Sequence, residues 1–182
     1  MPLPDLGTLT PRPALEHPDL LGESVAAALA TWELGRSVGV VEIDPDLADT
    51  AAMTQAYSVP LEVSANCVVV AGRRGGEERV AACVVRADTR ADVNNRVKRL
   101  LDVRKASFLS MDRAVAETGM EYGGITPLGL PSGWRVLVDA RAVDIAVTVI
   151  GSGVRRSKLV LPGPDLARLP GAEVVDGLGM AI

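Results

Sequence analysis

Histidine and cysteine are scarce in this chain, and their scarcity excludes several kinds of catalytic site. The one histidine among 182 residues, His17, lies in a proline-rich stretch with no Ser or Cys nucleophile motif beside it. A Ser-His-Asp or Cys-His mechanism is therefore not expected. The two cysteines, Cys67 and Cys83, lie inside apolar runs and not at a metal-ligand spacing, so we do not expect a zinc site. The residues leave metals with oxygen ligands open, but we expect no metal and no cofactor. Buried, reduced thiols are the expectation, although the two could face each other across paired strands.

Aromatic residues and long apolar runs are also rare. Aromatics make up 3% of the sequence, which argues against a groove that stacks single-stranded nucleic acid on aromatic side chains. No apolar run approaches the roughly 20 residues that cross a bilayer, and the first residues do not resemble a secretory signal. We therefore expect a cytoplasmic protein that does not enter membranes.

Positive charge is unevenly distributed along a chain whose net charge is −4. Residues 1–60 hold two Arg and nine acids, whereas residues 73–105 hold ten Lys or Arg and five acids. Two interpretations stay open, namely solvated helix and loop faces or a basic surface for phosphate groups.

The chain has the length of one domain and shows no internal repeat. Residues 1–19 hold five prolines and predict an extended arm, which leaves residues 20–182 as a single domain. Apolar spacing predicts helices at 20–34, 44–59, 91–103 and 111–119, and strands at 38–43, 66–72, 79–87, 134–140, 143–151 and 157–162. Gly75 and Gly76 predict a hairpin turn between the predicted strands 66–72 and 79–87. The pattern predicts an α/β (α+β) fold with a mixed, largely antiparallel sheet surrounded by helices.

Several segments, taken in order, carry a resemblance to a known family. They are DTAAM, VSANCVVVAG, DTRADVNNRVKRLL, VRKASFLS, TGMEYGGITPLGLP and VIGSGVRRSKLVL. In order and spacing the chain resembles the YbaK and prolyl-tRNA editing-domain family over roughly residues 47–175. The resemblance implies a YbaK-like fold and hydrolysis of the ester between a wrong amino acid and the 3′ end of a tRNA, often alanine or cysteine on proline tRNA.

The resemblance also implies where the site lies. The loop Gly123-Gly124-Ile125-Thr126-Pro127 matches the family's GxxxP loop, and Gly151-Ser152-Gly153 matches its late glycine turn. An aminoacyl ester is already activated, so a site without a catalytic triad needs mainly positioning and stabilisation of an oxyanion. We expect a pocket between the strand at Asn66, the 123–127 loop and the 151–153 turn, with catalytic roles for the residues Asn66, Gly123, Gly124, Thr126 and Pro127.

The chain departs from the family at one position. Members carry a lysine in the pattern I-A-K-S/T-L-V, and the matching stretch here places Ala65 at the lysine, or Asn66 in an alternative register. A lost charge-assisted contact is worth about 1.5–3 kcal/mol, so another cation is needed. The candidates are Arg90, Lys105 and Lys158. Asp88, Asp92 and Asp139 are candidates to bind the substrate's α-ammonium group or to accept a proton, with helix capping as the alternative for Asp88.

Three functions follow from these observations. The first is a trans-acting aminoacyl-tRNA deacylase, with tRNA and a synthetase as partners and with substrate-binding roles for the residues Ala65, Arg90, Lys105, Asp139, Gly151, Ser152 and Gly153. The second is a module of the same fold that binds tRNA or a nucleotide with weakened catalysis. The third is an interaction protein that forms a homodimer through its apolar strands.

Overall fold

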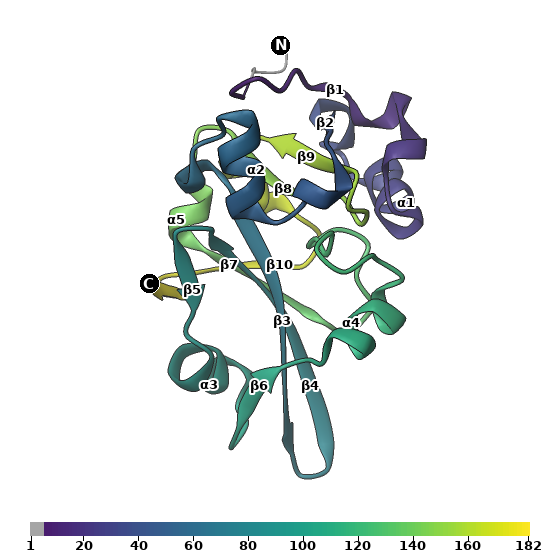
Figure 1. Cartoon of the computed structure of the whole chain (residues 1–182). Coiled ribbons are helices and arrows are strands. Elements are labelled where there is room, and N and C mark those ends of the chain that lie inside the picture. Colours follow the sequence, from purple (N-terminus) through teal and green to yellow (C-terminus); the bar gives the residue numbers. More distant parts are fainter. Residues whose placement is uncertain (1–5) are drawn as a thin grey trace.

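The computed structural model describes residues 6–182, which form a mixed α/β domain built around two main sheets (Figure 1). The sheet orders are β1-β2-β9-β8, β10-β7-β4-β3-β6 and, for a small third sheet, β11-β5. Only the contacts of β7 with β4 and β10 are parallel within this set. The predicted mixed, largely antiparallel fold is therefore confirmed.

The five-stranded sheet is built on a long hairpin. Its strands are β3 (Ala65–Arg74), β4 (Glu77–Arg86), β6 (Ala106–Phe108), β7 (Arg135–Asp139) and β10 (Ala172–Val175). Gly75 and Gly76 form the turn with φ angles of 58° and 81°, the left-handed values that glycine adopts without strain. The hairpin predicted from these two glycines is confirmed.

The four-stranded sheet lies in the upper half of Figure 1. Its strands are β1 (Arg12–Pro13), β2 (Gly39–Glu42), β8 (Thr148–Gly151) and β9 (Ser157–Leu161), and all its contacts are antiparallel. A parallel bridge between Ser64 and Val149 connects it to the start of β3. The small sheet consists of β5 (Thr89–Ala91) and β11 (Gly179–Ala181).

The helices surround the sheets as predicted, but several are shorter. They are α1 (Glu23–Thr31), α2 (Thr50–Tyr57), α3 (Lys98–Leu101), α4 (Met111–Thr118) and α5 (Ala140–Val143). Single turns of 3-10 helix span Ala14–Glu16, Pro18–Leu20, Gly35–Ser37, Pro45–Leu47 and Leu61–Val63; a longer 3-10 helix spans Gly163–Arg168, and a π-helical turn spans Val93–Val97.

Three predicted elements differ from the structure. The helix predicted at 44–59 is divided, because Asp44 caps only a 3-10 turn and Asp49 caps α2. The helix predicted at 91–103 begins as a π-helical turn, capped by Asp92. The strand predicted at 143–151 begins only at Thr148, because Asp139 caps α5, which ends at Val143, and residues 144–147 form a turn and bend after that helix.

Two further expectations concern the cysteines and the N-terminal segment. Cys67 lies opposite Val84 and Cys83 opposite Val68, so the two thiols are on opposite faces of the hairpin and do not face each other. Both thiols are free.

Residues 6–19 of the predicted arm form β1 and two 3-10 turns, with Leu9 and Ala14 buried; residues 1–5 lie outside the described part.

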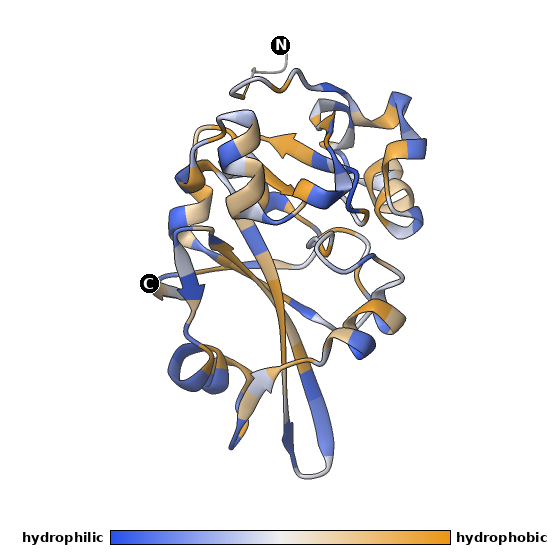
Figure 2. Ribbon diagram, viewed as in Figure 1, coloured by the Kyte–Doolittle hydropathy of each residue, from blue (hydrophilic) through white to orange (hydrophobic). Residues whose placement is uncertain are grey.

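Apolar side chains divide into three buried clusters, one between the two main sheets, one beneath α3 and one beneath α2. Figure 2 shows the apolar stretches along β3, β4, β8 and β9, and the hydrophilic end of the hairpin. Among residues 6–182 no helix has the length and apolar character needed to span a membrane.

Candidate functional site

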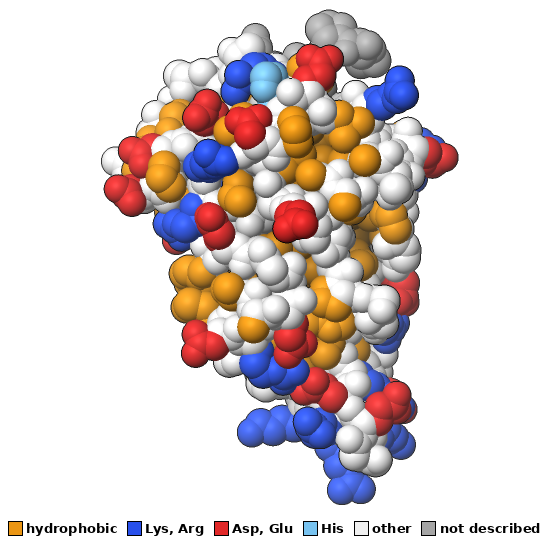
Figure 3. Space-filling model, turned by 90° about the vertical axis from the view of Figure 1, so that its right-hand side faces the viewer, with side chains coloured by type: hydrophobic (Ala, Val, Ile, Leu, Met, Phe, Trp, Pro, Cys, Tyr) orange, Lys and Arg blue, Asp and Glu red, His pale blue; other side chains and the backbone are white. Residues whose placement is uncertain are grey.

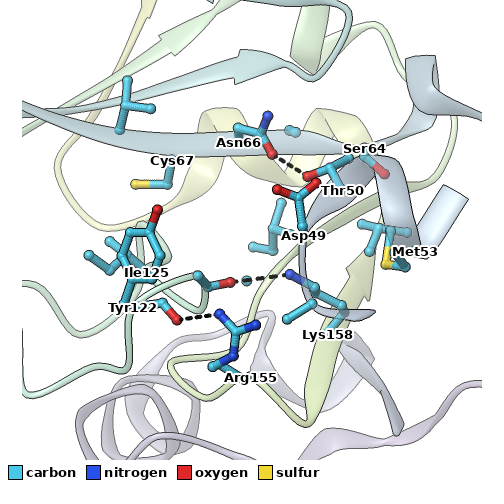
Figure 4. A pocket seen from close by; sticks show the side chains of 17 residues that line it. Asp49, Thr50, Met53, Ser64, Asn66, Cys67, Tyr122, Ile125, Arg155 and Lys158 are labelled. Atoms are coloured by element: carbon cyan, nitrogen blue, oxygen red, sulfur yellow. Dashed lines mark hydrogen bonds between the residues drawn. The ribbon is translucent and has the colours of Figure 1, made fainter. Parts of the chain in front are cut away.

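A cavity of about 340 Å³ lies where the two main sheets meet. Figure 4 shows it between the start of β3, the start of α2, the loop before Ile125 and strand β9. The lining residues are Ala48, Asp49, Thr50, Met53, Ser64, Ala65, Asn66, Cys67, Val68, Tyr122, Gly123, Ile125, Val149, Ile150, Gly151, Arg155 and Lys158.

The pairing of β3 explains why a cavity opens here. On the edge that faces away from β4, Ser64 bridges to Val149, and the carbonyl of Val69 accepts a hydrogen bond from the Leu109 amide at 2.9 Å. The segment 65–68 between these two contacts lines the cavity. The gap in the sheet edge therefore supplies one wall of the site.

Lys158 brings a buried cation to this wall from the opposite sheet. Its side chain is 7% exposed, and its Nζ donates to the Gly123 carbonyl oxygen at 3.4 Å. The pKa of Lys158 is lowered to about 8, mainly by burial and in part by the nearby Arg155 cation, whereas Asp49 acts in the opposite direction. At neutral pH the group is therefore a largely protonated ammonium with little water around it.

The start of α2 supplies the polar groups opposite Lys158. Asp49 caps the helix by accepting from the Ala51 amide at 3.0 Å, and the Thr50 hydroxyl donates to the Asn66 side-chain oxygen at 2.9 Å. Figure 4 shows the Asp49 carboxylate beside Thr50, facing the same space as the Lys158 ammonium. Asp49 is the one acid among the lining residues.

Glycines fix the loop that closes the cavity. The Gly124 carbonyl accepts from the Gly153 amide at 2.7 Å, and a Cβ on Gly124 would lie 2.8 Å from the Val154 backbone. A Cβ on Gly151 would lie 2.6 Å from the Ile125 carbonyl oxygen. Only residues without a side chain allow the two backbone segments to approach this closely.

Arg155 and the N-terminal segment brace the same loop. The Arg155 guanidinium donates to the carbonyl oxygens of Tyr122 and Pro45, at 3.1 and 2.9 Å. Behind the glycine turn, the Gly22 amide donates to the Ser152 carbonyl at 2.9 Å, and a Cβ on Gly22 would lie 3.0 Å from the Gly153 Cα. The loop is thus held from both sides.

The structure brings several predicted site residues together. Ala65, Asn66, Gly123 and Gly151 all line the cavity, and Gly124 lies directly behind it. The pocket therefore lies between the strand, the loop and the turn that the sequence singled out.

Other residues of the predicted loop and turn do not line the cavity. Thr126 is fully buried, and its hydroxyl has no hydrogen-bond partner among the described residues; Pro127 is also buried. The Ser152 hydroxyl bonds the Ser157 hydroxyl at 2.7 Å, and Gly153 packs against Gly22. These groups shape the loop from behind.

Three predicted binding residues lie elsewhere. Asp139 is 1% exposed and accepts from the amides of Arg141 and Gly179, so it holds α5 and β11. Arg90 is exposed on β5, and Lys105 is exposed beside the hairpin. Of the three cations proposed to replace the family lysine, only Lys158 reaches the cavity.

Asp88 also lies outside the cavity, and three residues that the sequence did not indicate lie in it. Asp88 does not cap a helix, because the residues that follow it form strand β5; its carboxylate accepts from Arg86 Nε at 2.8 Å. Sequence reasoning missed Asp49, Thr50 and Arg155; an Asp-Thr pair before a helical run was a signal for the first two. Within residues 6–182 no three His, Cys, Asp or Glu side chains gather as metal ligands would.

The fold and the cavity define an α/β domain with a buried lysine beside a glycine loop, a class of site suited to polarising a carbonyl group. The chain belongs to the aminoacyl-tRNA editing domain family, whose model matches residues 44–169. All the cavity-lining residues fall within this range.

Solved structures share the fold at low sequence identity. One is a hypothetical protein with 20% identity and a TM-score of 0.75, for which the match covers 87% of this chain and 100% of the other. Another is described as a proposed trans-editing enzyme for prolyl tRNA synthetase, with 21% identity, a TM-score of 0.73, and coverage of 85% and 94%.

Proposed function

We propose that the protein is a trans-acting aminoacyl-tRNA deacylase, which hydrolyses the ester of tRNA that carries a wrong amino acid. The observation that carries the proposal is the buried Lys158 ammonium facing the cavity of an editing-family domain. The likeness to a proposed trans-editing enzyme for prolyl tRNA synthetase favours alanyl- or cysteinyl-tRNA(Pro) as substrate, with prolyl-tRNA synthetase as the source of the error. The reaction would take place in the cytoplasm.

The reaction needs a water molecule, a polarised carbonyl and a leaving oxygen. Water attacks the ester carbonyl carbon, negative charge develops on the carbonyl oxygen, and the C–O bond to the terminal ribose breaks as the ribose oxygen takes up a proton. The Lys158 ammonium is the group that stabilises the developing charge, because a cation in a site with little water acts more strongly than one in solvent.

Asp49 supplies the complementary charge for the substrate's α-ammonium group. As the one carboxylate that lines the cavity, it faces the same space as Lys158. An aminoacyl ester places its ammonium next to the carbonyl carbon, so one acid and one cation in a single cavity match the two groups. The hydrogen bond between Thr50 and Asn66 keeps the start of α2 against β3.

The cavity's size and lining favour a small side chain. Its volume of about 340 Å³ has to hold the amino acid together with part of the terminal ribose. Met53, Ile125 and Ile150 provide apolar walls. An apolar pocket separates substrates that differ by one methylene by about 10–200-fold, so size alone would favour alanine or cysteine over larger residues.

The test is release of amino acid from a panel of mischarged tRNAs, beginning with alanyl- and cysteinyl-tRNA(Pro). The wild-type protein should deacylate at least one member, Lys158→Met should lower the rate by about 100-fold or more, and Gly124→Val should abolish it by displacing the loop. Lys98→Met, on α3 away from the cavity, is the matched control and should keep wild-type activity.

Two results would contradict the proposal. One is the absence of turnover with every substrate in the panel while tRNA is still bound, which would leave a binding module. The other is full activity in Lys158→Met, which would remove the residue on which the mechanism rests.

A further inference from the structure

A second hollow, of about 460 Å³, lies at the far end of the hairpin from the cavity. Its walls are formed by β3 and β4 of the hairpin, by strand β6 with the segments on either side of it, and by the start of α4. The lining residues are Ala71, Gly72, Arg73, Glu78, Arg104, Lys105, Ser107, Phe108, Leu109, Ser110 and Arg113. Figure 3 shows Lys and Arg side chains gathered at this lower end of the molecule.

The hollow carries an excess of positive charge. Four of its residues are cations, and its one acid, Glu78, is already bound by Arg113 through two hydrogen bonds of 2.9 Å. These bonds lower the pKa of Glu78, so the group stays a carboxylate that Arg113 neutralises.

The other acids nearby are also paired. Asp102 lies 2.7 Å from Arg74 and 3.2 Å from Arg79, and Glu77 lies 3.7 Å from Arg79. By contrast, Arg104 and Lys105 are exposed and form no ion pair with any residue between 6 and 182. Their charge is therefore available to a partner.

Exposed groups of other kinds accompany these cations. Phe108 is 60% exposed on β6, which is the edge strand of the five-stranded sheet. Ser107 and Ser110 place two hydroxyl groups beside it. Cations with hydroxyl donors suit phosphodiester oxygens, and an exposed ring offers a flat face to a base or ribose.

Strand β3 connects this hollow to the catalytic cavity. Residues 65–68 of β3 line the cavity and residues 71–73 line the hollow. Gly72 lies six positions after Asn66 along the strand, a distance of about 20 Å. When the aminoacylated end of an RNA enters the cavity, the phosphates of the nucleotides before it can reach the hollow at this distance.

We propose that the hollow formed by Arg73, Arg104, Lys105 and Phe108 docks the phosphodiester backbone of the tRNA whose 3′ end occupies the cavity. This inference rests on the proposed function for the identity of the RNA. The hollow contributes to the affinity for the RNA and to its placement, and not to the chemical step, because it lies away from the reacting ester.

The experiment compares two substrates that share the ester but not the RNA body. Aminoacylated tRNA presents both, whereas a 3′-aminoacyl-adenosine ester presents the ester alone. In the double variant Arg104→Glu/Lys105→Glu, kcat/KM for aminoacylated tRNA should fall by tenfold or more, while cleavage of the adenosine ester stays within twofold of wild type. Arg36→Glu reverses an exposed charge near α1 and is the control, with no expected effect on either substrate.

Binding of uncharged tRNA, followed by fluorescence anisotropy at several salt concentrations, tests the surface independently of catalysis. Loss of two phosphate contacts should reduce the slope of log K against log salt by about 2. Equal tRNA affinity and salt slope in wild type and double variant would overturn the docking surface even if hydrolysis proceeds. A weakened, less salt-dependent complex would support it even if no substrate is hydrolysed, in which case the proposed function alone fails.

Discussion

The Nζ of Lys158 lies 3.4 Å from the carbonyl oxygen of Gly123, so a cation from one sheet meets the glycine loop that closes the cavity against the other. This contact holds the ammonium beside the glycine loop, and the Gly123 carbonyl oxygen is its one hydrogen-bond partner in the described part of the chain. The ammonium keeps donor capacity for a substrate oxygen, because a lysine carries three N–H groups.

The rate of deacylation should fall as the pH rises above about 8. The pKa of Lys158 is lowered to about 8, and the mechanism uses its charged form, which predominates below that pH. The measurement is the rate of enzymatic deacylation of alanyl-tRNA(Pro) between pH 6 and 10, after subtraction of spontaneous ester hydrolysis.

A Lys158→Arg variant provides the control for this profile. Its guanidinium stays charged throughout the range, so the decline should disappear, whatever the absolute rate. An enzymatic rate that instead rises through pH 8 in the wild type would mean that the neutral amine is the active form, which is incompatible with a purely electrostatic role.

Lys158→Met should make the protein more stable at neutral pH. The pKa of the folded state, about 8, is below the unfolded value of 10.5, so the unfolded state binds the proton more tightly. The cost of burying the charge is fully present below pH 8 and disappears as the pH rises towards 10.5. We expect the free energy of unfolding at pH 7 to increase by on the order of 2 kcal/mol.

Urea denaturation at pH 7 and pH 10 measures this effect. The difference between wild type and Lys158→Met should shrink at the higher pH, and Lys98→Met should show no comparable gain. A loss of stability in Lys158→Met at pH 7 would show that Lys158 supports the fold instead of burdening it.

Asp49→Asn should weaken substrate binding without disturbing α2. Asparagine caps helices about as well as aspartate, so the change removes the charge and keeps the cap. The KM for alanyl-tRNA(Pro) should rise by about tenfold or more, and the KM for an N-acetylated substrate, which lacks the ammonium, should not change. Asp44→Asn, at a cap that does not line the cavity, serves as the comparison. An equal effect on both substrates would rule out recognition of the ammonium group.

Asp139→Ala should destabilise the fold and leave catalysis by folded molecules intact. The substitution leaves the buried amides of Arg141 and Gly179 without their acceptor. Loss of such a network costs about 3 kcal/mol, which urea denaturation would detect. A raised KM with unchanged stability would instead support the substrate-binding role that the sequence suggested for Asp139.

Local sequence signals were sufficient for much of the fold. The glycine pair at 75–76 located the hairpin, and apolar spacing located α4 within the predicted range 111–119. Each of these features depends on residues close together in the chain. The sequence could not show that α5 and the turn after it delay the strand predicted at 143–151 until Thr148, because Asp139 caps that helix only when the preceding strand brings its side chain into position.

The site was predictable in outline only. The glycine loop and the strand at Asn66 were identified from the family pattern, but Lys158 was one of three cations between which the sequence did not decide. Its side chain reaches the cavity because β9 pairs with β8 and β2, with Lys158 opposite Gly151 and Val41. The pairing of β9 with β2 joins segments more than 100 residues apart, and local patterns do not encode it.

The contact of Gly22 with the 152–153 turn makes residues outside the family region part of the site's support. A recombinant fragment cut to residues 44–169 would keep all the cavity-lining groups, yet its glycine loop would lose the backbone that now packs behind it. Function in such a fragment would depend on how tightly the remaining contacts hold the loop, so the proper unit for engineering or transplanting this activity includes the N-terminal segment.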